Sequence, residues 1–117
     1  MSQSKWVRVG SVRRFDLVSS FKPQALMPLE CAADVYQAWK EMEREHANCL
    51  ARGNESSGDG DVVAMRECLL DSCADVIQAT LNLVAALGVE DFRPYLKACE
   101  LRNRERGRIT DGKVVDE

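Results

Sequence analysis

The sequence lacks the residue patterns on which several common classes of protein depend. Its 117 residues include one histidine, and none of the five cysteines forms a Cys-x-x-Cys pair. Neither a zinc site nor a Cys/His catalytic pair is therefore expected. With only three prolines and seven glycines, the composition also argues against an extended disordered chain. We interpret the cysteines as small buried apolar residues in a reducing compartment.

Features that direct a protein to membranes or nucleic acids are also scarce. No uninterrupted apolar run approaches the roughly 20 residues that span a bilayer, and the first residues lack the apolar core of a secretion signal. A net charge of −3 provides no overall cationic field for nucleic acid or an anionic membrane. Aromatic residues, 6% of the chain, are not interleaved with its arginines. We therefore predict a cytoplasmic protein with no membrane partner, and we rank nucleic-acid binding last.

What the sequence does contain is helical periodicity in a composition typical of one soluble globular domain, with 45% hydrophobic and 30% charged residues. Apolar residues recur at three-to-four spacing in three segments, so we predict an all-α fold. A polar loop over 52–61 should separate the first two helices. The predicted helices run from Pro28 in a first turn to about Leu50, from Val62 to Leu87 with Gly88 ending the helix, and from near Glu90 or Asp91 to about Glu105 with Gly107 ending the helix.

This pattern divides the chain into an irregular or short helical lead-in over 1–27, a helical domain over 28–109 and a charged tail over 110–117. The second half of the middle helix is apolar nearly all round, so we expect it to pack both on its hairpin partner and on another subunit. Tyr36, Trp39 and Phe92 are candidate core residues, with base stacking as the alternative role for one of these aromatics.

The most informative feature is a pair of carboxylates four residues apart in each of the first two helices. Glu30 and Asp34 lie in the first, and Asp71 and Asp75 in the second. Residues at this spacing project from one helix face. If the helices pack side by side, four carboxylates converge, and a divalent cation is needed to offset their repulsion. The bland alternative is that such acids form a solvated helix face, but here both aspartates border apolar residues.

Such an all-oxygen cluster suits Mg²⁺, or Mn²⁺ in its place, and a substrate that carries phosphates. Glu67 extends the second acidic row, and Asn82 adds a neutral amide on the same face. The last helix supplies cations and an amide that could clamp a polyphosphate, although cations also gather at helix C-termini because of the macrodipole. The candidate phosphate-binding residues are Lys97, Arg102, Asn103 and Arg106.

Three motifs together resemble the MazG-like, all-α nucleoside triphosphate pyrophosphohydrolases, a family that includes dimeric dUTPases. They are Glu30-Cys-Ala-Ala-Asp34-Val, Asp71-Ser-Cys-Ala-Asp75-Val and the closing Asn103-Arg-Glu-Arg-Gly107-Arg. The resemblance covers about 28–109. It implies a helical bundle completed by oligomerisation to a homodimer or homotetramer, and Mg²⁺-dependent cleavage of nucleoside triphosphates to monophosphates and pyrophosphate.

The sequence departs from the family pattern, which is E-x-x-E in the first acidic helix and E-x-x-D in the second. Cys31 and Ser72 occupy the positions of the first glutamates, and the acids Glu30 and Asp71 stand one residue earlier. A shift of one residue turns a side chain by roughly 100° around the helix. Asp34 is also shorter than the family's glutamate. Two hypotheses follow: an active pyrophosphohydrolase with a reshaped site, or a nucleotide sensor or helical interaction module whose site has decayed.

For the enzyme, the resemblance assigns metal binding and catalysis to Glu30, Asp34, Asp71 and Asp75. Phosphate contacts fall to Lys97, Arg102, Asn103 and Arg106. Asn82 would contact the metal shell or the base. The base and sugar of the substrate stay open at this point.

Overall fold

The chain forms three α-helices, and the predicted all-α fold is confirmed. The computed structural model describes residues 6–18, 21–51 and 55–110, with only the backbone described over 55–62. No strand occurs in these ranges. The helices are α1 (Lys22–Ala51), α2 (Glu55–Ala86) and α3 (Arg93–Glu105). Two compact units result, 1–87 with α1 and α2, and 88–117 with α3. Each is described by itself.

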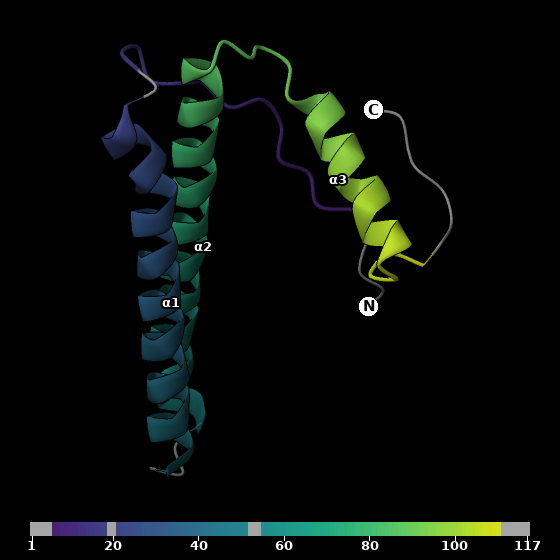
Figure 1. Ribbon diagram of the computed structural model, residues 1–117. Coiled ribbons are helices and arrows are strands. Elements are labelled where there is room, and N and C mark those ends of the chain that lie inside the picture. Colours follow the sequence, from purple (N-terminus) through teal and green to yellow (C-terminus); the bar gives the residue numbers. More distant parts are fainter. Residues whose placement is uncertain (1–5, 19–20, 52–54, 111–117) are drawn as a thin grey trace. The chain divides into compact units, whose positions relative to one another are not determined.

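In the first unit, α1 and α2 lie side by side as an antiparallel hairpin (Figure 1). The least exposed residues of each helix recur at alternating spacings of three and four, which is the heptad pattern of helices packed along a narrow seam. This α1–α2 seam consists of Gln24, Pro28, Cys31, Val35, Ala38, Met42, Glu45 and Cys49 in α1, and of Met65, Leu69, Ser72, Val76, Ala79, Leu83 and Ala86 in α2.

The seam defines two opposite faces of the hairpin. Each residue is turned by about 100° from its predecessor, so residues just before and just after a seam position point to opposite sides. The helices are antiparallel, so the residues that precede seam positions lie on the same side in both. We call this side the polar face, and the side formed by residues that follow seam positions the apolar face.

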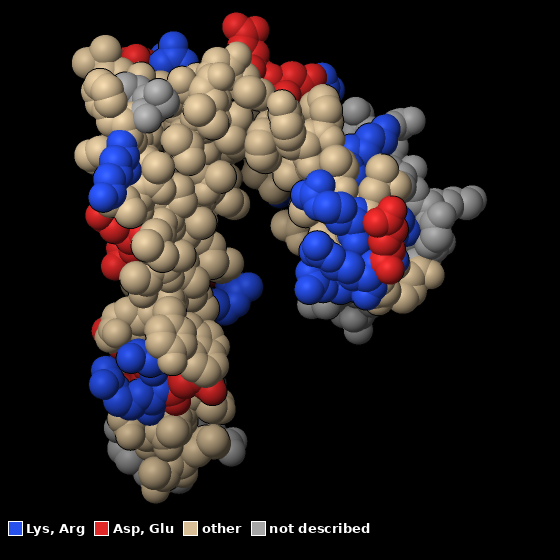
Figure 2. Space-filling view, viewed as in Figure 1, with Lys and Arg blue, Asp and Glu red and all other residues tan. Residues whose placement is uncertain are grey.

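The apolar face carries large side chains that nothing in the described chain covers. Leu29 is 68% exposed, Tyr36 61% and Trp39 44%, and each follows a seam position in α1. Leu70 and Ile77 continue this surface on α2 and are also exposed. Figure 2 shows uncharged residues over most of the visible side of the hairpin, with charged side chains at its edges and ends.

The prediction that Tyr36 and Trp39 belong to the core is therefore wrong for the isolated chain. Both lie one position beyond the seam, where the second helix does not reach them. Their rings stack on one another, with centroids 6.3 Å apart. Phe92, in the second unit, is only half-buried and stacks on Tyr95 at 5.6 Å.

Helix α1 begins six residues before the predicted start. Pro23, rather than Pro28, lies in its first turn, where the missing N–H costs nothing. The carbonyl of Phe21 accepts hydrogen bonds from the N–H groups of Gln24 and Ala25, at 2.9 and 3.2 Å. The predicted first-turn position of Pro28 is wrong: it lies inside α1, at a seam position.

Helix α2 also begins earlier than predicted, at Glu55 instead of Val62. The predicted loop over 52–61 is wrong from residue 55 onward, and 52–54 lie outside the described residues. Gly58 and Gly60 favoured a loop, because each glycine costs about 1 kcal/mol in a helix relative to alanine. Such local preferences do not include the stabilisation that packing gives a long helix.

The helix ends agree with the prediction. Gly88 follows α2 with φ +84°, and Gly107 follows α3 with φ +76°, a left-handed conformation that glycine adopts readily. At the end of α3, the N–H of Arg108 donates to the carbonyl of Asn103 at 2.9 Å, and the N–H of Gly107 donates to that of Arg104 at 3.0 Å. These two bonds form a Schellman motif.

The hairpin alone buries little. Among the residues whose burial is described, only Cys49, Ala79 and Asn82 are fully buried. One stretch of α2, Val63–Ala86, is long and apolar enough to cross a membrane by length and composition, with a mean hydropathy of 1.3. The core helix of a soluble protein meets the same criteria, so this stretch does not decide where the protein resides.

Candidate acidic site on the hairpin

The four acids predicted from the sequence lie on the polar face of the hairpin. Glu30 and Asp34 each precede a seam residue of α1, and Asp71 and Asp75 each precede a seam residue of α2. All four are exposed. The two helices thus present their acidic pairs on the same side, and we call this group the acidic cluster.

The two pairs also lie at the same height along the hairpin. Glu30 is 21 residues before the end of α1, and Asp75 is 20 residues after the start of α2. The same comparison gives 17 residues for Asp34 and 16 for Asp71. Both helices rise by about 1.5 Å per residue, so the pairs face each other across the seam.

The thiol of Cys31 reports the electrostatic potential at this point of the seam. Partial burial raises the pKa of Cys31, and the carboxylates of Asp75, Asp34 and Glu30 raise it further. Asp75 belongs to α2, and the other two acids belong to α1. Negative charge from both helices therefore concentrates around one seam position.

Within the described ranges, no three His, Cys, Asp or Glu side chains lie close enough together to hold a metal ion. The acids share a face and a height, but they do not form a closed ligand set in the single chain. Glu67, predicted to extend the row, donates nothing to it: its Oε1 lies 3.1 Å from Nη1 of Arg66, in an exposed ion pair.

The seam explains what distinguishes the two positions where acids are missing. Cys31 and Ser72 are both half-buried seam residues. A glutamate at either position would start from between the helices, next to Asp34 or Asp75. The acids that this chain has instead, Glu30 and Asp71, start from the outer side of the polar face. The difference moves carboxylate charge from the seam to the solvent.

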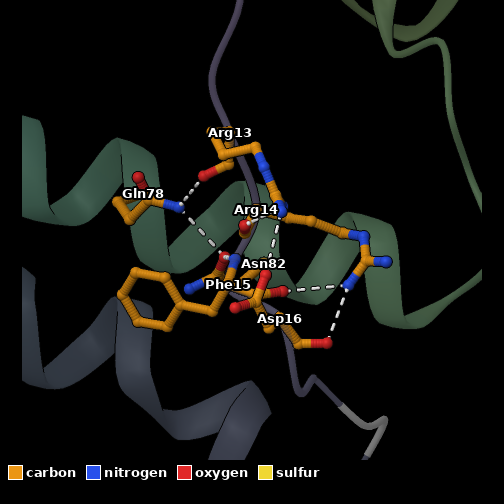
Figure 3. Close-up of polar contacts among 6 residues, drawn as sticks. All are labelled: Arg13, Arg14, Phe15, Asp16, Gln78 and Asn82. Carbon is orange, nitrogen blue, oxygen red and sulfur yellow. Dashed lines mark hydrogen bonds and ion pairs between the residues drawn. The ribbon is translucent and has the colours of Figure 1, made fainter.

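Asn82 lies on the polar face as predicted, but its amide is already engaged. It is 2% exposed, and its Oδ1 accepts hydrogen bonds from the N–H of Phe15 at 3.0 Å and from Nε2 of Gln78 at 3.0 Å. The same Nε2 of Gln78 lies 2.9 Å from the carbonyl of Arg13. Figure 3 shows this segment crossing α2 at these two side chains.

The predicted phosphate-binding residues lie in the second unit. Lys97, Arg102 and Arg106 are exposed on or just after α3. Asn103 has a structural role: its Nδ2 donates to the carbonyl of Cys99 at 3.0 Å, and its Oδ1 accepts from Nη1 of Arg108 at 3.1 Å. The closing Asn-x-x-x-Gly-Arg sequence thus serves at least to cap α3.

Comparison with known proteins leaves the chain without relatives: no protein family, curated protein or solved structure matches it. The geometry of its own residues must therefore carry the functional argument.

Sequence reasoning missed the segment that docks on Asn82. Arg13 and Phe15 were part of a lead-in with no assigned role, and Gln78 was not singled out. One signal was available, because Gln78 and Asn82 are polar residues four apart in the most apolar half of α2. Buried amides of this kind require hydrogen-bond partners, and the main chain of Arg13 and Phe15 provides them.

Proposed function

We propose that this protein is a Mg²⁺-dependent nucleoside triphosphate pyrophosphohydrolase that works as a homodimer or homotetramer in the cytoplasm. Its products would be a nucleoside monophosphate and pyrophosphate. The observation that carries the proposal is the acidic cluster, in which Glu30, Asp34, Asp71 and Asp75 share one face and one height of the hairpin. The sequence resemblance supplies the reaction, and the geometry supplies a place for it.

The donor set fits a hard divalent cation. It consists of carboxylates, and the raised pKa of Cys31 is the response of a thiol to uncompensated negative charge from Asp75, Asp34 and Glu30. Mg²⁺, or Mn²⁺ in its place, would be held by Asp34 and Asp75 with help from Glu30 and Asp71. When bound, the cation would polarise phosphoryl oxygens and favour ionisation of an attacking water.

The protein's own groups have separable tasks in this mechanism. Asp34 and Asp75 stand closest to the seam, so they are the acids best placed to bind the cation. Glu30 and Asp71, which start farther out, are better placed to orient an attacking water and to accept its proton. Lys97, Arg102 and Arg106 would contact phosphates, since guanidinium and ammonium groups stabilise the charge of the departing pyrophosphate. Asn82 contributes by positioning, because its amide is bonded to the main chain of Phe15.

Release of pyrophosphate from a panel of canonical and modified nucleoside triphosphates with Mg²⁺ tests the proposal. Asp75→Asn should lower the rate by about a hundredfold or more, the scale of a lost acid–base or metal-binding group. Glu41→Gln is the matched control, because it removes one carboxylate from the polar face two turns from Asp34. An unmodified protein no faster than Asp75→Asn on every substrate would refute the enzyme.

The seam positions of Cys31 and Ser72 favour a second candidate. With no carboxylate in the seam, the hairpin could serve as an interaction module or nucleotide sensor with a decayed catalytic site. Calorimetry with Mg²⁺ and a non-hydrolysable nucleotide separates the alternatives. Tight binding without turnover identifies a sensor, and no binding identifies an interaction module.

A further inference from the structure

The segment Arg13–Asp16 is attached to the polar face through its main chain. The N–H of Phe15 donates to Oδ1 of Asn82 at 3.0 Å, and the carbonyl of Arg13 accepts from Nε2 of Gln78 at 2.9 Å (Figure 3). The two amides are joined by their own 3.0 Å hydrogen bond. The position of the segment therefore does not depend on the side chains of Arg13 and Arg14.

Those two guanidinium groups make only local contacts. Arg13 donates to the carbonyl of Arg14 at 2.7 Å and to Oδ1 of Asp16 at 2.8 Å. Arg14 donates to the carbonyls of Phe15 and Asp16, at 2.9 and 3.2 Å. The Arg13–Asp16 pair is 75% and 86% exposed, so it contributes only about 0–1 kcal/mol. A phosphate group, which accepts two parallel N–H bonds from a guanidinium, would replace these contacts favourably.

The segment lies beside the acidic cluster. Gln78 is three residues after Asp75 and Asn82 is seven after it, so their anchoring points are about 4.5 and 10.5 Å farther along α2. All three side chains precede seam positions and share the polar face. The residues Arg13–Asp16 line an open hollow of about 520 Å³ at this place. Two cations thus border a concentration of carboxylates on one surface.

We propose that Arg13 and Arg14 form a phosphate-binding site that takes the polyphosphate of a nucleoside triphosphate next to the acidic cluster. This inference rests on the proposed function for the identity of its ligand. The physical need is charge balance, because carboxylates repel a polyphosphate wherever a cation does not neutralise them. Within the first unit, Arg13 and Arg14 are cations that the fold holds beside those carboxylates.

Isothermal titration of the full chain with sodium tripolyphosphate, with and without Mg²⁺, tests the site without requiring catalysis. Replacing both residues, R13Q with R14Q, should weaken binding by about tenfold or more, the effect of losing charge-assisted bonds worth about 1.4 kcal/mol. The paired change R13K with R14K keeps the charges but loses the planar fork, so its affinity should be intermediate. Arg66→Gln, an exposed arginine on the apolar face, is the control for net charge and should change binding less than twofold.

The results distinguish this site from the pyrophosphohydrolase proposal. Tripolyphosphate binding that depends on Arg13 and Arg14, in a protein that hydrolyses no nucleotide, supports the site and removes the enzyme. Pyrophosphate release and tripolyphosphate binding that are both unchanged in the glutamine variant overturn the site and leave the enzyme. Equal weakening by Arg66→Gln would show a nonspecific charge effect and would also overturn the site. Because only the main chain anchors the segment, circular dichroism of the variants should match that of the unmodified protein.

Discussion

At the scale of single residues, the decisive property is position relative to the α1–α2 seam. Asp34 and Cys31 are neighbours on one helix, but the first is exposed on the polar face and the second is half-buried between the helices. The sequence motif identified both positions. It could not tell that the missing family acids correspond to seam positions, because the pairing of α1 with α2 fixes which residues face the partner helix.

Cys31 provides a direct probe of cation binding to the acidic cluster. Its thiolate is disfavoured by burial and by Asp75, Asp34 and Glu30, so its pKa is raised and alkylation near neutral pH should be slow. A bound Mg²⁺ would offset the carboxylates, lower this pKa and increase the alkylation rate. Mass spectrometry of iodoacetamide-treated protein gives the rate for each cysteine, and the exposed Cys68 is the internal control. An Mg²⁺ effect equal at Cys31 and Cys68, or absent at both, would contradict cation binding here.

Restoring glutamates in the seam should strengthen metal binding. The double variant Cys31→Glu with Ser72→Glu adds carboxylates beside Asp34 and Asp75, so we expect Mg²⁺ affinity to rise by about tenfold and pyrophosphate release to increase. Without Mg²⁺ the variant should be less stable by about 1–3 kcal/mol, because the new carboxylates are partly buried and repel the existing ones.

Ala38→Glu is the matched control for the restoration, since it places a glutamate in the seam two turns beyond Cys31. It should lower thermal stability without raising Mg²⁺ affinity. Calorimetric titration and thermal unfolding with and without Mg²⁺ measure both effects. If the double variant binds Mg²⁺ no better than the unmodified protein, the seam positions do not belong to the metal site.

At the scale of elements, the helix ends were easier to predict than the helix starts. Gly88 and Gly107 ended α2 and α3 as expected, because a left-handed residue with no side chain has few alternatives. The starts of α1 and α2 lay earlier than expected. Two prolines competed for the first turn of α1, and glycines in α2 suggested a loop. Those local signals carry about 1 kcal/mol each in the case of glycine, which the packing of two long helices can exceed.

The start of α3 is set by an ion pair whose pH dependence can be measured. Nε and Nη2 of Arg93 each lie 2.9 Å from Asp91, and the N–H of Arg93 donates to Oδ1 at 3.1 Å. These bonds lower the pKa of Asp91 from 3.8 to about 2. Because the folded pKa is below the unfolded one, the stabilisation is fully present above pH 3.8 and is lost as the pH falls through about 2.

Carbon-detected NMR of the Asp91 carboxyl group should therefore give a midpoint near 2. In Arg93→Ala the midpoint should rise most of the way to 3.8, since the side-chain bonds are the largest cause of the shift and the backbone bond is retained. An Asp91 midpoint that is already ordinary in the unmodified protein would show that the pair does not form in solution.

At the scale of the whole molecule, the first unit is a hairpin with two unlike faces. One bears the acidic cluster and the docked segment Arg13–Asp16, and the other bears exposed aromatic and aliphatic side chains. The sequence predicted that α2 would need a second partner because it is apolar nearly all round. It did not predict that Tyr36 and Trp39 of α1 share this need, since helical periodicity alone does not separate a seam from the stripe next to it.

The apolar face has the size and composition of a dimer interface. Helix α1 has 30 residues, so it is about 45 Å long. With α2 beside it at a diameter of about 10 Å, the face offers roughly 900 Å², comparable to the ~800 Å² that each partner buries in a stable complex. A second copy packed on this face would form a four-helix bundle and leave the acidic cluster open to a nucleotide.

Tyr36→Glu combined with Ile77→Glu should convert the protein to monomers, because each new carboxylate would be buried without a partner in the bundle. Gln37→Glu combined with Ala64→Glu adds the same charge to the polar face and should leave the oligomer intact. Sedimentation velocity over a range of concentrations distinguishes the species. The apolar face is not the interface if both double variants sediment like the unmodified protein. If instead the unmodified protein is already monomeric at its highest soluble concentration, the dimer itself is refuted. The acidic cluster would then have to work within one chain.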